Sequence, residues 1–282
     1  MKKYIIPILI ILVTVTGCES SLYKVLYNSL DSFIYHGITG YVDPNPEQER
    51  MLRGKIDVFM GWHRREELPK YAATLRQLRG RVAAGLREAD MLWMKRRVEA
   101  HGADLFNAVS DDVVALLLSL GPDQVDRMER KMNENIAKME KESSVSDDKR
   151  FRESERSVTR MMEFLYGPLS EKQKAEIGRG VRWVDNLDAE RIRLHRERQA
   201  EFLALIRGKP DRAALKGYLA RLIINPERSY PGYYRERAER RDRTIVEGFL
   251  RFDRELVTAD QRAHAVKKID MLIQVLNELN RG

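Results

Sequence analysis

The sequence predicts an all-α protein, an elongated bundle of about eight to ten helices. Three observations support this fold class. Apolar residues recur at steps of three and four along most of the chain, which is the period of an amphipathic helix. No segment alternates convincingly with period two, and no Asn-Gly hairpin turn is present. Helix formers such as Glu, Arg, Lys, Ala, Leu and Met dominate the composition.

Composition narrows the class of protein further. The 282 residues include 51 Lys and Arg and 43 Asp and Glu, so the formal net charge is +8. One third of the residues are charged and 43% are hydrophobic, which excludes a polytopic membrane protein and argues against a wholly disordered chain. A single cysteine excludes an internal disulfide framework and a cysteine-built zinc site.

The N-terminus predicts export. Lys2 and Lys3 precede a short apolar stretch, which ends in Val-Thr-Gly-Cys at residues 15–18. This order is that of a secretory signal over residues 1–17, and the apolar stretch is too short for an ordinary transmembrane helix. The four residues resemble the bacterial lipoprotein box, which implies an acylated Cys18 after cleavage. The alternative is an ordinary signal with an incidental Cys18.

The predicted location limits the partners. Glu19 follows the cysteine, whereas Asp there tends to retain enteric lipoproteins in the inner membrane, so the resemblance implies the periplasmic face of the outer membrane. Removing Lys2 and Lys3 from the 51 basic residues leaves 49 against 43 acidic residues, a net charge of +6. We expect a membrane contact through Cys18 and an envelope protein or anionic envelope polymer as partner, with no nucleic acid and no cofactor. The alternative is a solvated, salt-bridged helical surface.

The elements follow in order from apolar stripes. Residues 18–45 are predicted to form the lipidated anchor and a connecting helix, and residues 46–282 an all-helical periplasmic domain with a possible division near 143–148, where the sequence is polar. The stripes are read as core-facing. They comprise Leu22, Val25, Leu26, Leu30, Phe33 and Ile34; Leu52, Ile56, Phe59 and His63; Leu75, Leu78, Val82, Leu86 and Trp93; Met128, Met132, Ile136 and Met139; and Val266, Ile269, Ile273, Leu276 and Leu279.

Four helix starts share one pattern of capping residues. Ser170 and Thr258 are predicted N-caps, with Gln173 and Gln261 at the third helical position as their reciprocal partners. Asn45-Pro46-Glu47-Gln48 and Gly121-Pro122-Asp123-Gln124 have the same order, with proline at the first helical position. The unequal spacing of the four glutamines argues against a solenoid repeat. The segments after Leu169 and Val257 also resemble the Leu-Thr-x-x-Gln boxes of Spy/CpxP-type periplasmic proteins, which are small helical stress chaperones or sensors.

The string from Trp62 to Ala72, Trp-His-Arg-Arg-Glu-Glu-Leu-Pro-Lys-Tyr-Ala, is the most unusual of the chain. It resembles the hallmark of a family of uncharacterised proteobacterial lipoproteins with a Trp-His-Arg-x-Glu-Leu-Pro-x-Tyr-Ala segment. The likeness extends to the Tyr- and Leu-rich stretch from Tyr23 to Tyr35 and to the Asp43–Gln48 segment. It implies an envelope location and a helical fold, and it implies no catalytic residue.

Two interpretations of this string stay open. In the first it is a structural or partner-binding corner, in which Pro69 starts a new helix, Trp62 is largely buried, and His63 or an arginine pairs with an acid. In the second, an enzyme or metal-dependent hydrolase uses the corner formed by His63, Glu66 and Glu67. No metal site and no catalytic residue is assigned, because His-Glu-x-x-His is absent and the other histidines are scattered. The candidate residues are Trp62, His63, Arg64, Glu66, Glu67, Pro69 and Tyr71.

Overall fold

The computed structural model describes residues 19–224 and 226–281, so the predicted leader and Cys18 lie outside the described residues. The described part contains no strand, which confirms the all-α prediction. It has twelve α-helices, or eleven if α4, the π turn and α5 are counted as one rod, slightly more than expected. The helices are α2 (Glu19–Asn28), α3 (Leu30–Thr39), α4 (Pro46–Trp62), a π turn (His63–Glu67), α5 (Leu68–Ala84), α6 (Glu88–Leu118), α7 (Pro122–Ser143), α8 (Asp147–Tyr166), α9 (Glu171–Trp183), α10 (Asp188–Arg207), α11 (Arg212–Ile223), a 3-10 turn (Pro226–Ser229), α12 (Gly232–Glu255) and α13 (Ala259–Arg281).

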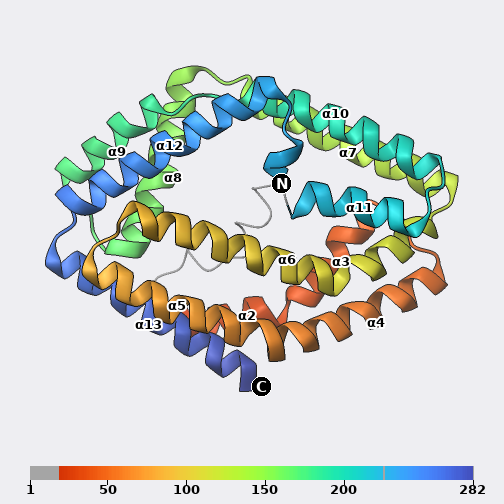
Figure 1. Ribbon diagram of the computed structural model, residues 1–282, viewed down its shortest axis with the longest axis horizontal. Coiled ribbons are helices and arrows are strands. Elements are labelled where there is room, and N and C mark those ends of the chain that lie inside the picture. The colour runs from red at the N-terminus through yellow and green to blue at the C-terminus, as the bar shows by residue number, and fades with distance from the viewer. Residues whose placement is uncertain (1–18, 225, 282) are drawn as a thin grey trace.

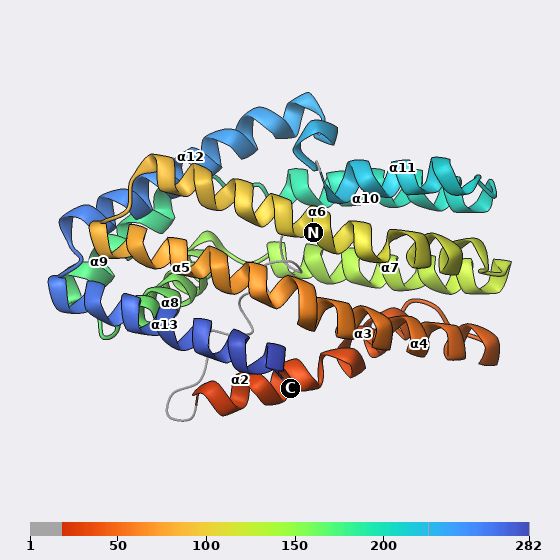
Figure 2. The same ribbon diagram turned by 60° about the horizontal axis from the view of Figure 1, so that its bottom comes forward.

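The helices are arranged around an elongated outline. α4, α5 and α13 run along one long side, and α7 with α10 lies on the other (Figure 1). α8, α9 and α12 make up one end, while α6 runs between the two long sides in both views (Figures 1 and 2). None of the described helices combines the length and the apolar character that crossing a bilayer would need.

The core consists of several clusters, two of them large and on different sets of helices. One cluster joins α5, α8, α9, α12 and α13 around Met162, Tyr166 and Phe252. The other joins α6, α7, α10 and α11 around Phe106 and Leu215. Two packed ends connected by long helices explain the elongated shape. The polar stretch near 143–148 is the short connection between α7 and α8, with Ser146 as the N-cap of α8.

The N-terminal segment differs from the expected single connecting helix. It forms two helices, α2 and α3, which pack on α13 and α4 respectively. Tyr23 is buried against Leu68, Val275 and Leu279. The apolar stripe read from the sequence is only partly core-facing, because Val25 is 61% exposed and Phe33 is 59% exposed.

The capping glutamines pair two by two across the fold. Ser170 caps α9 through Gln173, and Thr258 caps α13 through Gln261, with both reciprocal bonds present in each. Gln173 Nε2 also donates a hydrogen bond to Gln261 Oε1 at 2.7 Å, and Gln261 Nε2 donates one to Gln173 Oε1 at 3.1 Å. The side-chain amides of Gln48 on α4 and Gln124 on α7 form the same two reciprocal hydrogen bonds, at 3.3 and 2.8 Å.

These two junctions have one geometry. Each glutamine donates a second bond to the backbone carbonyl two residues before its partner's N-cap, and the four acceptors are Ser119, Asp43, Leu256 and Pro168. The α4–α7 junction and the α9–α13 junction lie at opposite ends of the long axis (Figure 2). The four similar capping sequences therefore build the two ends of the molecule.

Candidate functional site

The Trp62–Ala72 string forms a π turn inside a continuous helical rod. Leu68 N–H donates to the carbonyl of His63, five residues earlier, and the backbone of His63, Glu67 and Leu68 stays helical. Pro69 does lie at the start of α5, after α4 ends at Trp62, but the corner expected between them is absent, because the chain stays helical through the π turn. Proline has no N–H and crowds the carbonyl four residues before it, and one wider turn accommodates both effects without breaking the helix.

His63 lies in an aromatic pocket and has no acidic partner among the described residues. Its Nδ1 is 2.9 Å from the hydroxyl of Tyr27 on α2, and the rings of Phe59 and Tyr71 lie 5.7 and 5.6 Å from its own. Burial lowers the pKa of His63 to about 4, so the imidazole is neutral at pH 7. Among the described residues, neither His63 nor the two arginines after it form an ion pair, so the prediction that His63 or an arginine pairs with an acid is wrong. Trp62 beside His63 is largely, though not fully, buried, as predicted.

The other candidate residues have separate surroundings. Arg64 donates to Asn28 Oδ1 at 3.1 Å, and its guanidinium lies over the Tyr27 ring. Glu66 is exposed, and no described residue forms an ion pair with it. The ring of Tyr71 lies between those of His63 and His101, at 5.6 and 4.7 Å, and burial raises its pKa. His63, Glu66 and Glu67 therefore do not converge on one point.

Glu67 is the centre of a second cluster. Its side chain is fully buried, and its Oε1 accepts from Lys70 Nζ at 2.6 Å. The same ammonium lies 2.9 Å from Asp104 Oδ2 on α6. Glu67 Oε2 faces Nδ1 of His101, also on α6, at 3.7 Å, and neither of these two buried atoms has a hydrogen-bond partner among the described residues. Glu67, His101 and Asp104 each place one ligand atom within 4.8 Å of the others.

Sequence reasoning missed His101 and Asp104. In the sequence, His101 is one of several scattered histidines that show no metal-ligand spacing. The available signal was the spacing of three between His101 and Asp104, which places both on one face of a helix. Only the packing of α6 beside α5 brings this pair to Glu67.

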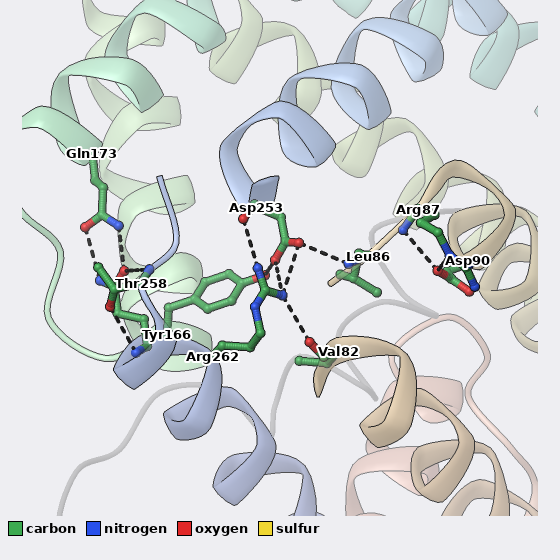
Figure 3. A network of polar contacts seen from close by, with 10 residues as sticks. Val82, Leu86, Arg87, Asp90, Tyr166, Gln173, Asp253, Thr258 and Arg262 are labelled. Carbon is green, nitrogen blue, oxygen red and sulfur yellow. Dashed lines mark hydrogen bonds and ion pairs between the residues drawn. The ribbon is translucent and has the colours of Figure 1, made fainter. Parts of the chain in front are cut away.

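A third polar cluster is fully satisfied. Asp253 is almost completely buried, and its carboxylate accepts bonds from Tyr166, Leu86 N–H and Arg262 at 2.8–3.2 Å (Figure 3). Arg262 also donates to the carbonyls of Val82 and Asp253. The cluster joins the ends of α5, α8, α12 and α13, so its role is to fix the positions of these helices.

An arginine stripe marks the surface of α8. Arg152, Arg156 and Arg160 are exposed and follow one another at steps of four, so they share one helix face. None of the three has an acidic oxygen within 4 Å among the described residues. Like charges at this spacing weaken an isolated helix slightly, so the stripe does not serve the stability of α8.

Comparison with known proteins identifies the family of the chain. A family model described as a family of unknown function, DUF6279, matches residues 40–235. The chain belongs to DUF6279. The match covers the π turn, the Glu67 cluster and the arginine stripe, while α2, α3, α13 and most of α12 lie outside it. No curated protein and no solved structure matches the chain.

Proposed function

We propose that this DUF6279 protein is an envelope lipoprotein, acylated at Cys18, whose body binds the phosphate-bearing headgroups of envelope lipids. The observation that carries the proposal is the stripe of Arg152, Arg156 and Arg160, which has no acidic partner among the described residues, and the predicted export signal supports it. Guanidinium groups bind phosphate in a planar, bidentate way, and a rise of about 1.5 Å per residue spaces the three about 6 Å apart. A row of headgroups offers anions at comparable intervals.

The N-terminal helix supports a position close to the membrane. α2 begins at Glu19, the residue after Cys18, and Tyr23 is already packed in the body. No more than a few residues therefore separate the proposed acyl chains from the folded domain. The alternative of an enzyme needs His63, Glu66 and Glu67 at one site. Because these residues have separate surroundings, we propose headgroup binding in its place.

Acyl labelling tests the anchor. Cells expressing the wild-type chain or Cys18→Ser are grown with a labelled fatty acid, and their membranes are separated. We expect label in the wild type and none in Cys18→Ser, together with release of the variant from the membrane fraction. Equal labelling of the two chains contradicts lipidation at Cys18.

Vesicle binding tests the stripe. Soluble Cys18→Ser protein is mixed with phosphatidylglycerol vesicles, with lipopolysaccharide, and with neutral phosphatidylcholine vesicles. Each basic residue near an anionic surface contributes about 1 kcal/mol, so replacing all three stripe arginines by Gln should weaken binding by about a hundredfold. The loss should be smaller in high salt, where the wild type also binds weakly.

The matched control removes three arginines that already have acidic partners. Arg53, Arg79 and Arg207 pair with Glu49, Asp270 and Asp126 at 2.6–2.9 Å. Their replacement by Gln lowers the net charge equally but leaves the stripe intact, so binding should fall much less. Equal losses in the two triple variants, or equal binding to phosphatidylcholine, would contradict the assignment.

A further inference from the structure

The Glu67 cluster contains two buried polar atoms that face each other without a partner. Oε2 of Glu67 and Nδ1 of His101 are 3.7 Å apart, which is too long for a hydrogen bond. Both are shielded from solvent by protein atoms. A buried polar group without a partner costs about 1–3 kcal/mol, and more when it is charged. Because these two groups point at each other, one bound group that contacts both would satisfy them together.

The hydrogen bond of the second nitrogen of His101 indicates what kind of group binds there. Nε2 is 2.9 Å from the hydroxyl of Thr74 on α5. When Nε2–H donates to this hydroxyl, Nδ1 presents a lone pair to the carboxylate oxygen of Glu67, and two acceptors then face each other. This arrangement is the one found around metal-bound histidines, whose outer nitrogen is held by a hydrogen bond.

Lys70 shows that the cluster already binds positive charge. Its ammonium bridges Glu67 Oε1 and Asp104 Oδ2, and it reaches them from the solvent side, where its side chain is 46% exposed. Asp104 is open on the same side, at 43%. A cation from solvent therefore meets Asp104 first, and it can reach Glu67 once the flexible lysine withdraws.

We infer that Glu67, His101 and Asp104 form a site for one divalent transition-metal ion of the zinc class, in competition with Lys70. One imidazole nitrogen and two carboxylates are a ligand set that Zn²⁺ accepts, with solvent completing the coordination. The nitrogen ligand argues against Mg²⁺ and Ca²⁺, which prefer oxygen. The π turn supports the site, because such turns frequently occur where a helix must direct a side chain to a functional position.

Calorimetry with Zn²⁺ alone tests the inference on the mature Cys18→Ser chain. We expect one equivalent to bind to the wild type. His101→Gln should weaken binding by at least about tenfold. Lys70→Met should tighten it, because it removes the competing ammonium. Glu66→Gln changes an exposed acid of the same π turn and should leave the affinity unchanged.

A second readout separates this site from incidental binding elsewhere. In nitrogen NMR spectra of the histidine rings, Zn²⁺ should shift Nδ1 of His101 while Nε2 stays protonated. Circular dichroism confirms that each variant is folded before its affinity is compared. No stoichiometric binding, a shift confined to other histidines, or an affinity that is indifferent to His101→Gln and to Lys70→Met would overturn the inference.

Discussion

At the scale of single residues, burial decides which ionisable groups are fixed and which stay available. Asp253 and Arg262 satisfy each other within a buried network, and His63 is neutral beside Tyr27. Arg156 on α8 and Lys70 at the Glu67 cluster are accessible to solvent. The ionisable residues of the Trp62–Ala72 string therefore include both buried and solvent-accessible groups, and the sequence alone does not separate them.

The neutral state of His63 predicts a pH dependence of stability. Its folded pKa of about 4 lies below the ordinary value of 6.5, so the unfolded chain binds more protons between these two values. The contribution of His63 is complete above pH 6.5 and is lost as the pH falls towards 4. One pKa unit corresponds to about 1.4 kcal/mol, so the loss reaches roughly 3 kcal/mol by pH 4.

Urea unfolding between pH 7 and pH 4 measures this loss. The difference in free energy of unfolding between the wild type and His63→Gln should shrink across the window, because the variant lacks the titrating group. His36→Gln, which changes an exposed histidine of α3, should follow the wild-type curve. A His63→Gln curve parallel to that of the wild type would show that folding does not change the pKa of His63.

The buried pair predicts a large effect from one substitution. Arg262→Met leaves the Asp253 carboxylate buried without its counterion, which should lower the free energy of unfolding by about 3–5 kcal/mol. Arg254→Met is the control on the same side of the molecule. Arg254 pairs only at the surface with Glu255, so its loss should stay within about 0.5 kcal/mol. Similar unfolding curves for the two variants would contradict a structural role for the network.

At the scale of elements, local sequence predicts where capped helices start, but not how one helix continues into the next. Ser170 and Thr258 cap helices as expected, because a cap depends on neighbours within four residues. Pro69 lies at the start of α5 as predicted, but no corner forms there. Whether a proline follows a break or a π turn depends on packing on both sides of it. The pairing of Gln48 with Gln124 and of Gln173 with Gln261 joins positions far apart, which no local pattern encodes.

The paired junctions predict that Glu cannot replace Gln173. Glu serves as well as Gln in an ordinary capping box, because the cap needs only an acceptor at this position. Gln173 additionally donates to Leu256 O and to Gln261 Oε1. Gln173→Glu loses both bonds and buries a charge, so we expect a destabilisation of about 1–3 kcal/mol by thermal or urea unfolding.

The control for this substitution is Gln77→Glu on the exposed face of α5, which should be close to neutral. A double-mutant cycle with Gln261→Ala then isolates the contact between the two glutamines. Equal effects of Gln173→Glu and Gln77→Glu would reduce the junction to simple capping.

At the scale of the whole molecule, the sequence predicted the fold class but not how the ends of the chain meet. Helical periodicity and composition are local properties and were sufficient for an all-α fold. The Glu67 cluster needed residues from α5 and α6, and the packing of α2 needed a helix from the far end of the chain. Val25 and Phe33 fit a helical stripe but face outwards, because α2 and α3 cover only the edge of the body.

Because α2 packs on α13, we predict that one substitution in this contact loosens α2 alone. Tyr23 packs on Leu68, Val275 and Leu279, and Lys24 pairs with Glu278 at 2.5 Å. α2 also contacts the π turn through Tyr27 and Asn28, and Tyr23 is its one buried residue among those described. Tyr23→Ala should therefore loosen α2 while the two large clusters stay folded. Limited proteolysis should then cut between residues 19 and 45 much faster, with a small change in the global unfolding midpoint.

Val25→Ala changes an exposed residue of the same helix and should leave the cleavage rate unchanged. Leu215→Ala, in the middle of the α6–α11 cluster, should instead lower the global midpoint, since cavities of this kind cost about 2–5 kcal/mol. If Tyr23→Ala behaves like Leu215→Ala, then α2 unfolds together with the whole domain. In that case a pull on the proposed anchor at Cys18 is resisted by the entire body and not by the contact between α2 and α13 alone.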